Sequence, residues 1–118
     1  MPKLRHLAIR TEDTGKLATF YMDVFEMQVL HKDKQEGGAI YLTDGYINLA
    51  ILPARGGREG IDHFGFQVDE MEHTLATASN AGAKGDNEKK PRDGRFAEMG
   101  IHDPAGTPVD VSVKGWKA

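Results

Sequence analysis

Two short stretches of the chain decide its fold: Leu4-Arg-His-Leu-Ala-Ile-Arg10 and Ile61-Asp-His-Phe-Gly-Phe-Gln67. Each alternates between two kinds of side chain, as a β-strand does, and each carries a histidine at its third place. Each is followed by an acidic turn and then by a helical pattern. The chain is therefore an internal repeat of one supersecondary unit.

The helical patterns after these strands differ in strength. The first predicts a helix over about 14–27 with one buried apolar stripe, formed by Leu17, Phe20, Tyr21, Val24 and Phe25. Asp13 is placed to cap its first turn, because an aspartate at that position accepts a backbone N–H. The second, weaker pattern predicts a helix over about 71–81 that ends at Gly82.

The later strands also occur in pairs. Residues 39–42 and 46–52 predict one hairpin, and residues 96–101 and 109–113 predict another. The sequence therefore predicts a single α+β domain over residues 1–118, with two βαβββ modules at 1–54 and 61–118 and a linker at 55–60. We expect the modules to form a curved, barrel-like mixed sheet that encloses a cleft, with the helices outside.

Composition excludes several function classes. The 118 residues hold 15 basic and 18 acidic side chains, a net charge of −3, which argues against nucleic acid or an anionic membrane as partner. There is no cysteine, so a disulfide, a zinc–thiolate site and a cysteine nucleophile are impossible. No apolar run is long enough for a membrane helix, and no signal peptide is recognisable, so we expect a soluble cytoplasmic protein.

Strand alternation brings four polar side chains to equivalent inward positions: His6, Asn48, His63 and Asp110. Two imidazoles and one carboxylate make a ligand set that suits Fe(II), Mn(II), Ni(II) or Zn(II). Asn48 is either a weak fourth ligand or part of the wall. The simpler alternative for each histidine is a hydrogen-bonded wall residue. Aspartate is a poor strand former, so its place in a Val-rich strand favours a functional role.

The sequence resembles the vicinal-oxygen-chelate superfamily, which includes glyoxalase I, extradiol dioxygenases and bleomycin-binding proteins. The matching pieces are the two strands quoted above, Phe20-Tyr-Met-Asp-Val-Phe-Glu-Met27 and the turn Asp103-Pro-Ala-Gly106. The resemblance implies metal ligands at His6, His63 and Asp110. It departs from the usual pattern at Asp110, where the family usually has Glu, and at Asn48, where glyoxalase I usually has a second Glu.

Further roles follow from this resemblance. Superfamily enzymes chelate substrate oxygens with the metal, which leaves proton abstraction to a side chain. Glu98 is the candidate base, and its alternative is an exposed strand residue or a partner of Arg95. Candidate substrate-binding residues are Arg10, Tyr41, Asn48 and Gln67.

Two functions remain open from the sequence. One is a metal-dependent enzyme, either an extradiol-type dioxygenase or a glyoxalase-like lyase or isomerase. The other is a metal-free protein that binds a small molecule, as the bleomycin-binding relatives do. The resemblance also implies a homodimer, because relatives bury sheet edges and helix flanks by pairing.

Overall fold

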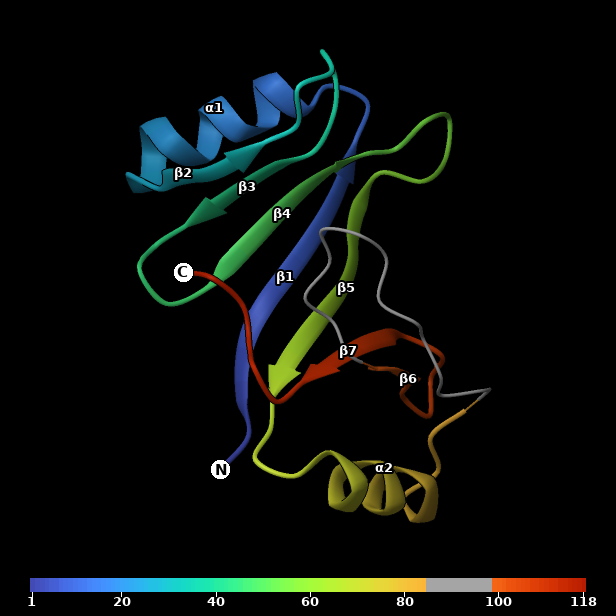
Figure 1. The fold of residues 1–118 in the computed structure, drawn as a ribbon. Helices are drawn as coiled ribbons and strands as arrows, with labels where there is room; N and C mark the ends of the chain where they lie inside the picture. The colour runs from blue at the N-terminus through green and yellow to red at the C-terminus, as the bar shows by residue number, and fades with distance from the viewer. Residues whose placement is uncertain (85–98) are drawn as a thin grey trace. The chain divides into compact units, whose positions relative to one another are not determined.

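The computed structural model describes residues 1–84 and 99–118 (Figure 1). Their elements follow the order β1, α1, β2, β3, β4, β5, α2, β6, β7. The bounds are β1 Lys3–Thr11, α1 Thr14–Phe25, β2 Gln28–Lys32, β3 Ile40–Thr43, β4 Asn48–Pro53, β5 Gly60–Gln67, α2 Met71–Asn80, β6 Met99–His102 and β7 Pro108–Ser112. Strand, helix and further strands therefore occur twice in succession.

The strands form one mixed sheet of seven strands, in the order β2-β3-β4-β1-β5-β7-β6. β1 pairs with β4 in parallel, and β5 pairs with β7 in parallel. The hairpin partners β3/β4 and β6/β7 are antiparallel. The predicted class, α+β with two βαβββ-like modules, is confirmed. The exact module bounds at 1–54 and 61–118 stay a prediction.

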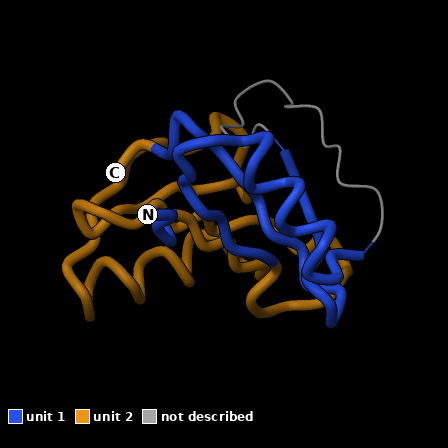
Figure 2. The backbone as a smooth tube through the Cα atoms, turned by 90° about the horizontal axis from the view of Figure 1, so that it is seen from below, with its two compact units in different colours: residues 1–5, 63–116 blue, residues 6–62, 117–118 orange. Residues whose placement is uncertain are grey.

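Two compact units divide the described residues (Figure 2). Unit 1 comprises residues 1–5 and 63–116, and unit 2 comprises residues 6–62 and 117–118. β1 and β5 each contribute residues to both units, so a unit is not the same as a module of the repeat.

The core of unit 2 lies where α1 packs against β3 and β4. Its buried residues are Ala18, Ile40, Leu42, Leu49 and Ile51. Leu7 and Ile9 of β1 join this cluster, as expected for the side of the strand opposite His6. Asp13 caps α1 as predicted, since its Oδ1 accepts from the backbone N–H of Lys16 at 3.0 Å.

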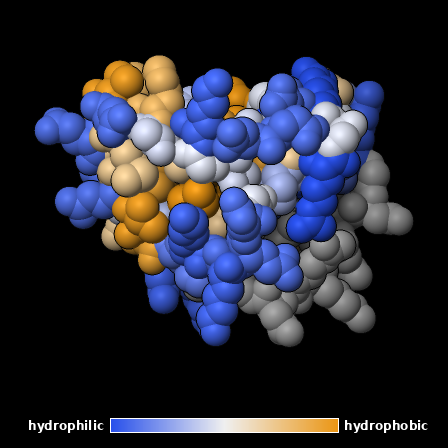
Figure 3. Space-filling view, turned by 90° about the horizontal axis from the view of Figure 1, so that it is seen from above, coloured by the Kyte–Doolittle hydropathy of each residue, from blue (hydrophilic) through white to orange (hydrophobic). Residues whose placement is uncertain are grey.

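The predicted apolar stripe of α1 is only partly buried. Leu17 and Tyr21 pack against the core, but Phe20, Val24 and Phe25 are 51%, 54% and 60% exposed. The helix contacts the sheet through Ala18, Leu17 and Tyr21. The apolar stripe is wider than this contact, so its remaining residues are exposed to solvent. Figure 3 shows apolar side chains gathered over α1.

A second apolar cluster occupies the other side of the same strands. It contains Ala8, Ala39, Ala50 and Leu52, with Tyr41 packed against it. Ala8 pairs with Ala50 across the parallel strands, and Ala50 pairs with Tyr41 across the hairpin. This side is the one that carries His6, because residues two apart on a strand face the same way.

Unit 1 holds α2, β6, β7 and most of β5. α2 has no fully buried residue, and it is followed by Gly82 at φ +98°, the left-handed residue that the sequence predicts at this helix end. The expected strand over 96–101 is observed as Met99–His102 within the described residues, because 96–98 lie outside them.

The chain after β7 folds back and buries Trp116, which is 7% exposed. Gly115, at φ +74°, directs this turn, and its N–H donates to Oγ of Ser112 at 3.0 Å. Gln67 lies so close to Gly115 that a Cβ there would stand 2.6 Å from its Oε1. The left-handed backbone at φ +74° favours glycine at this position, and any other residue would also displace the end of the Gln67 side chain.

Among residues 1–84 and 99–118, no helix has the length and apolar character needed to span a bilayer.

Candidate metal centre

His63 and Asp110 form a buried pair within unit 1. Nε2 of His63 lies 3.1 Å from Oδ2 of Asp110, and their side chains are 7% and 6% exposed. Gly65 of β5 and Gly100 of β6 are the strand partners of Asp110 on its two sides. Since neither partner carries a side chain, the space beside the carboxylate stays open to a histidine or an ion. A buried carboxylate also needs such a partner.

His6 and Asn48 form a second buried pair, within unit 2. They are Cα partners in the parallel strands β1 and β4, and Nδ1 of His6 lies 2.9 Å from Oδ1 of Asn48. The amide nitrogen of Asn48 donates to the backbone carbonyl of Lys117 at 3.0 Å. Both side chains are at least nine-tenths buried, at 5% and 3% exposure. Asn48 is thus engaged through both ends of its amide.

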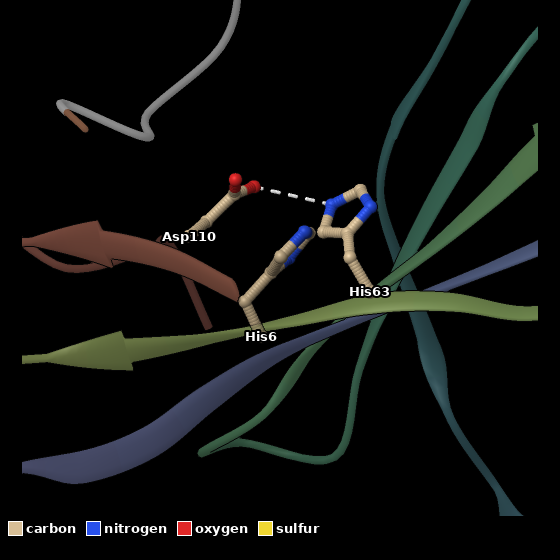
Figure 4. Close-up of side chains that lie close together, drawn as sticks. All are labelled: His6, His63 and Asp110. Atoms are coloured by element: carbon tan, nitrogen blue, oxygen red, sulfur yellow. Dashed lines mark ion pairs between the residues drawn. The ribbon is translucent and has the colours of Figure 1, made fainter. Parts of the chain in front are cut away.

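His6, His63 and Asp110 make up a possible metal-binding group. One ligand atom from each residue lies within 4.8 Å of the other two, and all three residues are buried. Figure 4 shows the imidazole rings and the carboxylate pointing toward one another from β1, β5 and β7. Two neutral nitrogens and one anionic oxygen fit a divalent transition metal, and they leave further coordination positions for small ligands.

The strand register places Asp110 differently from the repeat. The sequence predicts that Asn48 and Asp110 are equivalent, and Asn48 does pair with His6. Asp110 instead pairs with Gly65, two residues beyond His63. A shift of two residues keeps a side chain on its face of the sheet, so Asp110 still lies on the face of His63.

Arg10 is a predicted substrate-binding residue that already has protein partners. Its Nε lies 3.0 Å from Oδ1 of Asp62, and an Nη donates to the backbone carbonyl of Pro53 at 3.2 Å. The side chains of Arg10 and Asp62 are about one-third exposed, at 34% and 32%. A role in substrate binding stays a prediction.

Gln67 is also engaged within the protein. Its Oε1 accepts from Arg5 at 2.7 Å, and its Nε2 donates to the carbonyl of Val113 at 3.3 Å. Arg5 also donates to the carbonyl of Trp116 at 3.4 Å. Gln67 therefore holds the C-terminal segment, a role that strand alternation does not indicate. Its predicted contact with a substrate, like that of Tyr41, is untested.

Glu98, the predicted base, lies outside the described residues. The backbone carbonyl of Lys117 is a further partner of Asn48, and the sequence does not indicate it. No sequence signal could have revealed this partner, since every residue type carries a backbone carbonyl.

Comparison with known proteins identifies the family. A family profile described as "Glyoxalase-like domain" matches residues 6–112, and the chain belongs to this family, within the vicinal-oxygen-chelate superfamily. None of the curated proteins matches the chain.

Solved structures with the same fold are distant in sequence. A hypothetical protein from Bacillus halodurans C-125 is 19% identical, with a TM-score of 0.75 and coverage of 99% of this chain and 97% of that one. Homoprotocatechuate 2,3-dioxygenase from Brevibacterium fuscum, complexed with 3,4-dihydroxyphenylacetate, is 19% identical, with a TM-score of 0.70 and coverage of 93% and 35%. Methylmalonyl-CoA epimerase from Streptomyces coelicolor is 20% identical, with a TM-score of 0.62 and coverage of 92% and 94%. The chain thus spans about a third of the dioxygenase's length.

Proposed function

We propose that the protein is a metal-dependent enzyme of the glyoxalase and dioxygenase type, which takes a small oxygenated substrate. The observation that carries this proposal is the buried donor set of His6, His63 and Asp110, whose ligand atoms lie within 4.8 Å of one another. Burial of an aspartate beside two imidazoles is costly in the absence of a compensating cation or hydrogen bonds.

The residues present fit Fe(II), Mn(II), Ni(II) or Zn(II). When bound, such an ion supplies Lewis acidity that polarises substrate oxygens. Asp110 would offset part of the ion's charge, and the two imidazoles would hold it as neutral ligands. Glu98 is proposed as the base that takes a substrate proton, with Arg10, Tyr41 and Gln67 as substrate contacts. Asn48 belongs to the wall beside His6 in this proposal.

The reaction is proposed to be either an extradiol-type ring cleavage or a glyoxalase-like lyase or isomerase reaction. Among the structural neighbours, the dioxygenase is complexed with a catechol and the epimerase with a nitronate analogue of an acyl-CoA. The catechol carries oxygens on neighbouring carbon atoms, and the nitronate carries its oxygens on one nitrogen. A metal ion can chelate either arrangement of oxygens. These neighbours support the proposed class of substrate for this protein, and the reactions that they catalyse are not part of that support.

Metal uptake is the first test. The protein is purified without a polyhistidine tag, stripped with a chelator and titrated with each of the four ions by calorimetry. We expect one ion per chain, and loss of binding in the double variant His6→Ala/His63→Ala. Reconstituted protein is then assayed for oxygen consumption with catechols and for isomerisation of a hemithioacetal. Absence of metal binding with all four ions contradicts the proposal.

A metal-free binding protein is the second candidate, and one observation favours it. The possible ligands already have partners within the protein, because His63 pairs with Asp110 and His6 pairs with Asn48. Such pairs satisfy buried polar groups in the absence of an ion. This candidate predicts that small planar or anionic molecules raise the melting temperature equally with and without a chelator.

A further inference from the structure

Asn48 sits between His6 and the C-terminal segment, and its amide has one possible orientation. The carbonyl of Lys117 only accepts hydrogen bonds, so the amide nitrogen must face it, at 3.0 Å. The amide oxygen then faces Nδ1 of His6, at 2.9 Å. The reverse orientation would place the amide oxygen against the carbonyl oxygen of Lys117 and lose that bond.

This orientation determines the protonation of the imidazole ring. An amide oxygen is an acceptor, so Nδ1 of His6 must carry the hydrogen in that bond. In a neutral ring the other nitrogen, Nε2, then carries the lone pair. The nitrogen with the lone pair is the one that can coordinate a metal ion. The bond is built into the sheet, because His6 and Asn48 are register partners in the parallel strands β1 and β4.

We propose that Asn48 is a positioning residue that holds His6 in the Nδ1–H tautomer, with Nε2 presented as the metal ligand. The inference rests on the proposed function for the identity of the ion's site. In this proposal Asn48 contacts the metal ligand His6 and not the metal itself. The sequence instead suggests that Asn48 is a direct ligand or a substrate contact.

Burial makes this hydrogen bond consequential. His6 and Asn48 are 5% and 3% exposed, so bulk water does not compete freely for either group. In the absence of the amide oxygen, neutral His6 can exchange between its two tautomers, and part of the population has a hydrogen on Nε2. Metal binding must then displace that hydrogen to the other nitrogen. Loss of such a partner behind a ligand typically weakens metal affinity about 10- to 100-fold.

The test reads the tautomer first, in metal-free protein. Long-range ¹H–¹⁵N correlation spectra distinguish Nδ1–H from Nε2–H, and the His6→Gln variant assigns the signals. We expect the Nδ1–H form in the wild type and in Asn48→Asp, which keeps an acceptor oxygen, and mixed tautomers in Asn48→Leu. The matched control is Thr43→Val, since Thr43 is buried, pairs with Asn48 across the hairpin and bonds to the N–H of Gly45.

Zn(II) affinity is then measured in the same proteins by competition with a chromophoric chelator. We expect a dissociation constant about 10- to 100-fold higher in Asn48→Leu, and a value near wild type in Thr43→Val. An Nε2–H tautomer of His6 in the wild type overturns the inference. Equal Zn(II) affinity in wild type and Asn48→Leu also overturns it.

The two proposals fail in different ways. If the wild type has the Nδ1–H tautomer but binds none of the four metal ions, the proposed function is contradicted. If the wild type binds metal but Asn48→Leu changes neither tautomer nor affinity, the proposed function stands and the positioning role of Asn48 is wrong.

Discussion

The carboxylate of Asp110 lies 3.1 Å from Nε2 of His63, with both side chains more than nine-tenths buried. The pair joins β7 to β5 across a parallel ladder in which the partner of Asp110 is Gly65. Asp110 therefore has two possible uses: it is the hydrogen-bond partner of His63 in the metal-free protein, and it is the anionic ligand when a cation is present. Substitution separates these uses, since only the second depends on the metal.

Asp110→Ala is expected to abolish tight metal binding, with affinity reduced by more than about 100-fold. Removal of a direct ligand weakens metal affinity at least as much as removal of a residue that only orients a ligand. Asp110→Glu is expected to keep the metal, since it restores the carboxylate that the family usually carries there. Calorimetric titration with Zn(II) and Mn(II) checks both variants. Ser112→Ala, a change on the same face of β7, is the control. Wild-type affinity in Asp110→Ala would mean that Asp110 is only a polar wall residue.

Leu42→Ala is expected to lower the free energy of unfolding by about 2–5 kcal/mol, because Leu42 is completely buried in the core beneath α1. Val24→Ala on the exposed side of the same helix is the matched comparison, and we expect a change within about 0.5 kcal/mol. Urea denaturation followed by circular dichroism measures both. A large loss in Val24→Ala would show that the exposed side of α1 is covered in solution.

Asp44 is expected to make the protein's stability depend on acid pH. The backbone N–H groups of Ile47 and Tyr46 donate to its carboxylate and hold its pKa below the ordinary value of 3.8. A lowered pKa means that the charged form stabilises the fold above pH 3.8, and that this contribution is lost as the pH falls through the lower, folded-state pKa.

Asp44→Asn tests this dependence because it keeps an acceptor oxygen and removes the charge. At pH 7 we expect the wild type to be more stable by at most about 1 kcal/mol, since an exposed carboxylate is screened by solvent. The difference between the two proteins should shrink toward zero in acid. Urea melts at a series of pH values measure it, and a difference that stays constant into strong acid would contradict the assignment.

The homodimer also remains a prediction, with the exposed side of α1 as the surface that a second copy would cover. Phe20, Val24 and Phe25 are all exposed on that helix, and exposed apolar side chains that gather together mark an interaction site. We expect a solution mass twice the chain's 13.0 kDa, and a shift to monomer in Phe25→Glu. Light scattering at micromolar concentration measures both, and a wild-type mass of one chain would end this prediction.

Much of the fold can be predicted from periodicity, and the exceptions have physical reasons. The alternation in Leu4–Arg10 and Ile61–Gln67 correctly predicts β1 and β5, and Asp13 correctly predicts the start of α1. The βαβββ pattern implies a strand after α1, but periodicity does not locate β2, because most of its residues are exposed and it lacks the alternation of a half-buried strand. Periodicity overestimates the buried stripe of α1, since it reports which residues are apolar and not how much of the sheet is available to cover them.

The candidate site could be predicted as far as side-chain direction. Alternation places His6, His63 and Asp110 on inward faces, and the three ligand atoms do lie close together. Alternation does not determine the register partner of Asp110, because a displacement of two residues leaves the alternation unchanged. The path of residues 112–117, on which the orientation of Asn48 depends, is not encoded in any periodic pattern.

The bond between Asn48 and Lys117 has a consequence for how this protein tolerates sequence drift. Its acceptor is the main-chain carbonyl of Lys117, which all twenty amino acids possess, so the bond itself does not depend on the type of side chain at position 117. What must persist is the course of the backbone, and Gly115 is the residue that constrains it. Substitution of Gly115, which has no functional group of its own, would therefore disturb the imidazole of His6, whereas exchange of the Lys117 side chain would leave this bond in place.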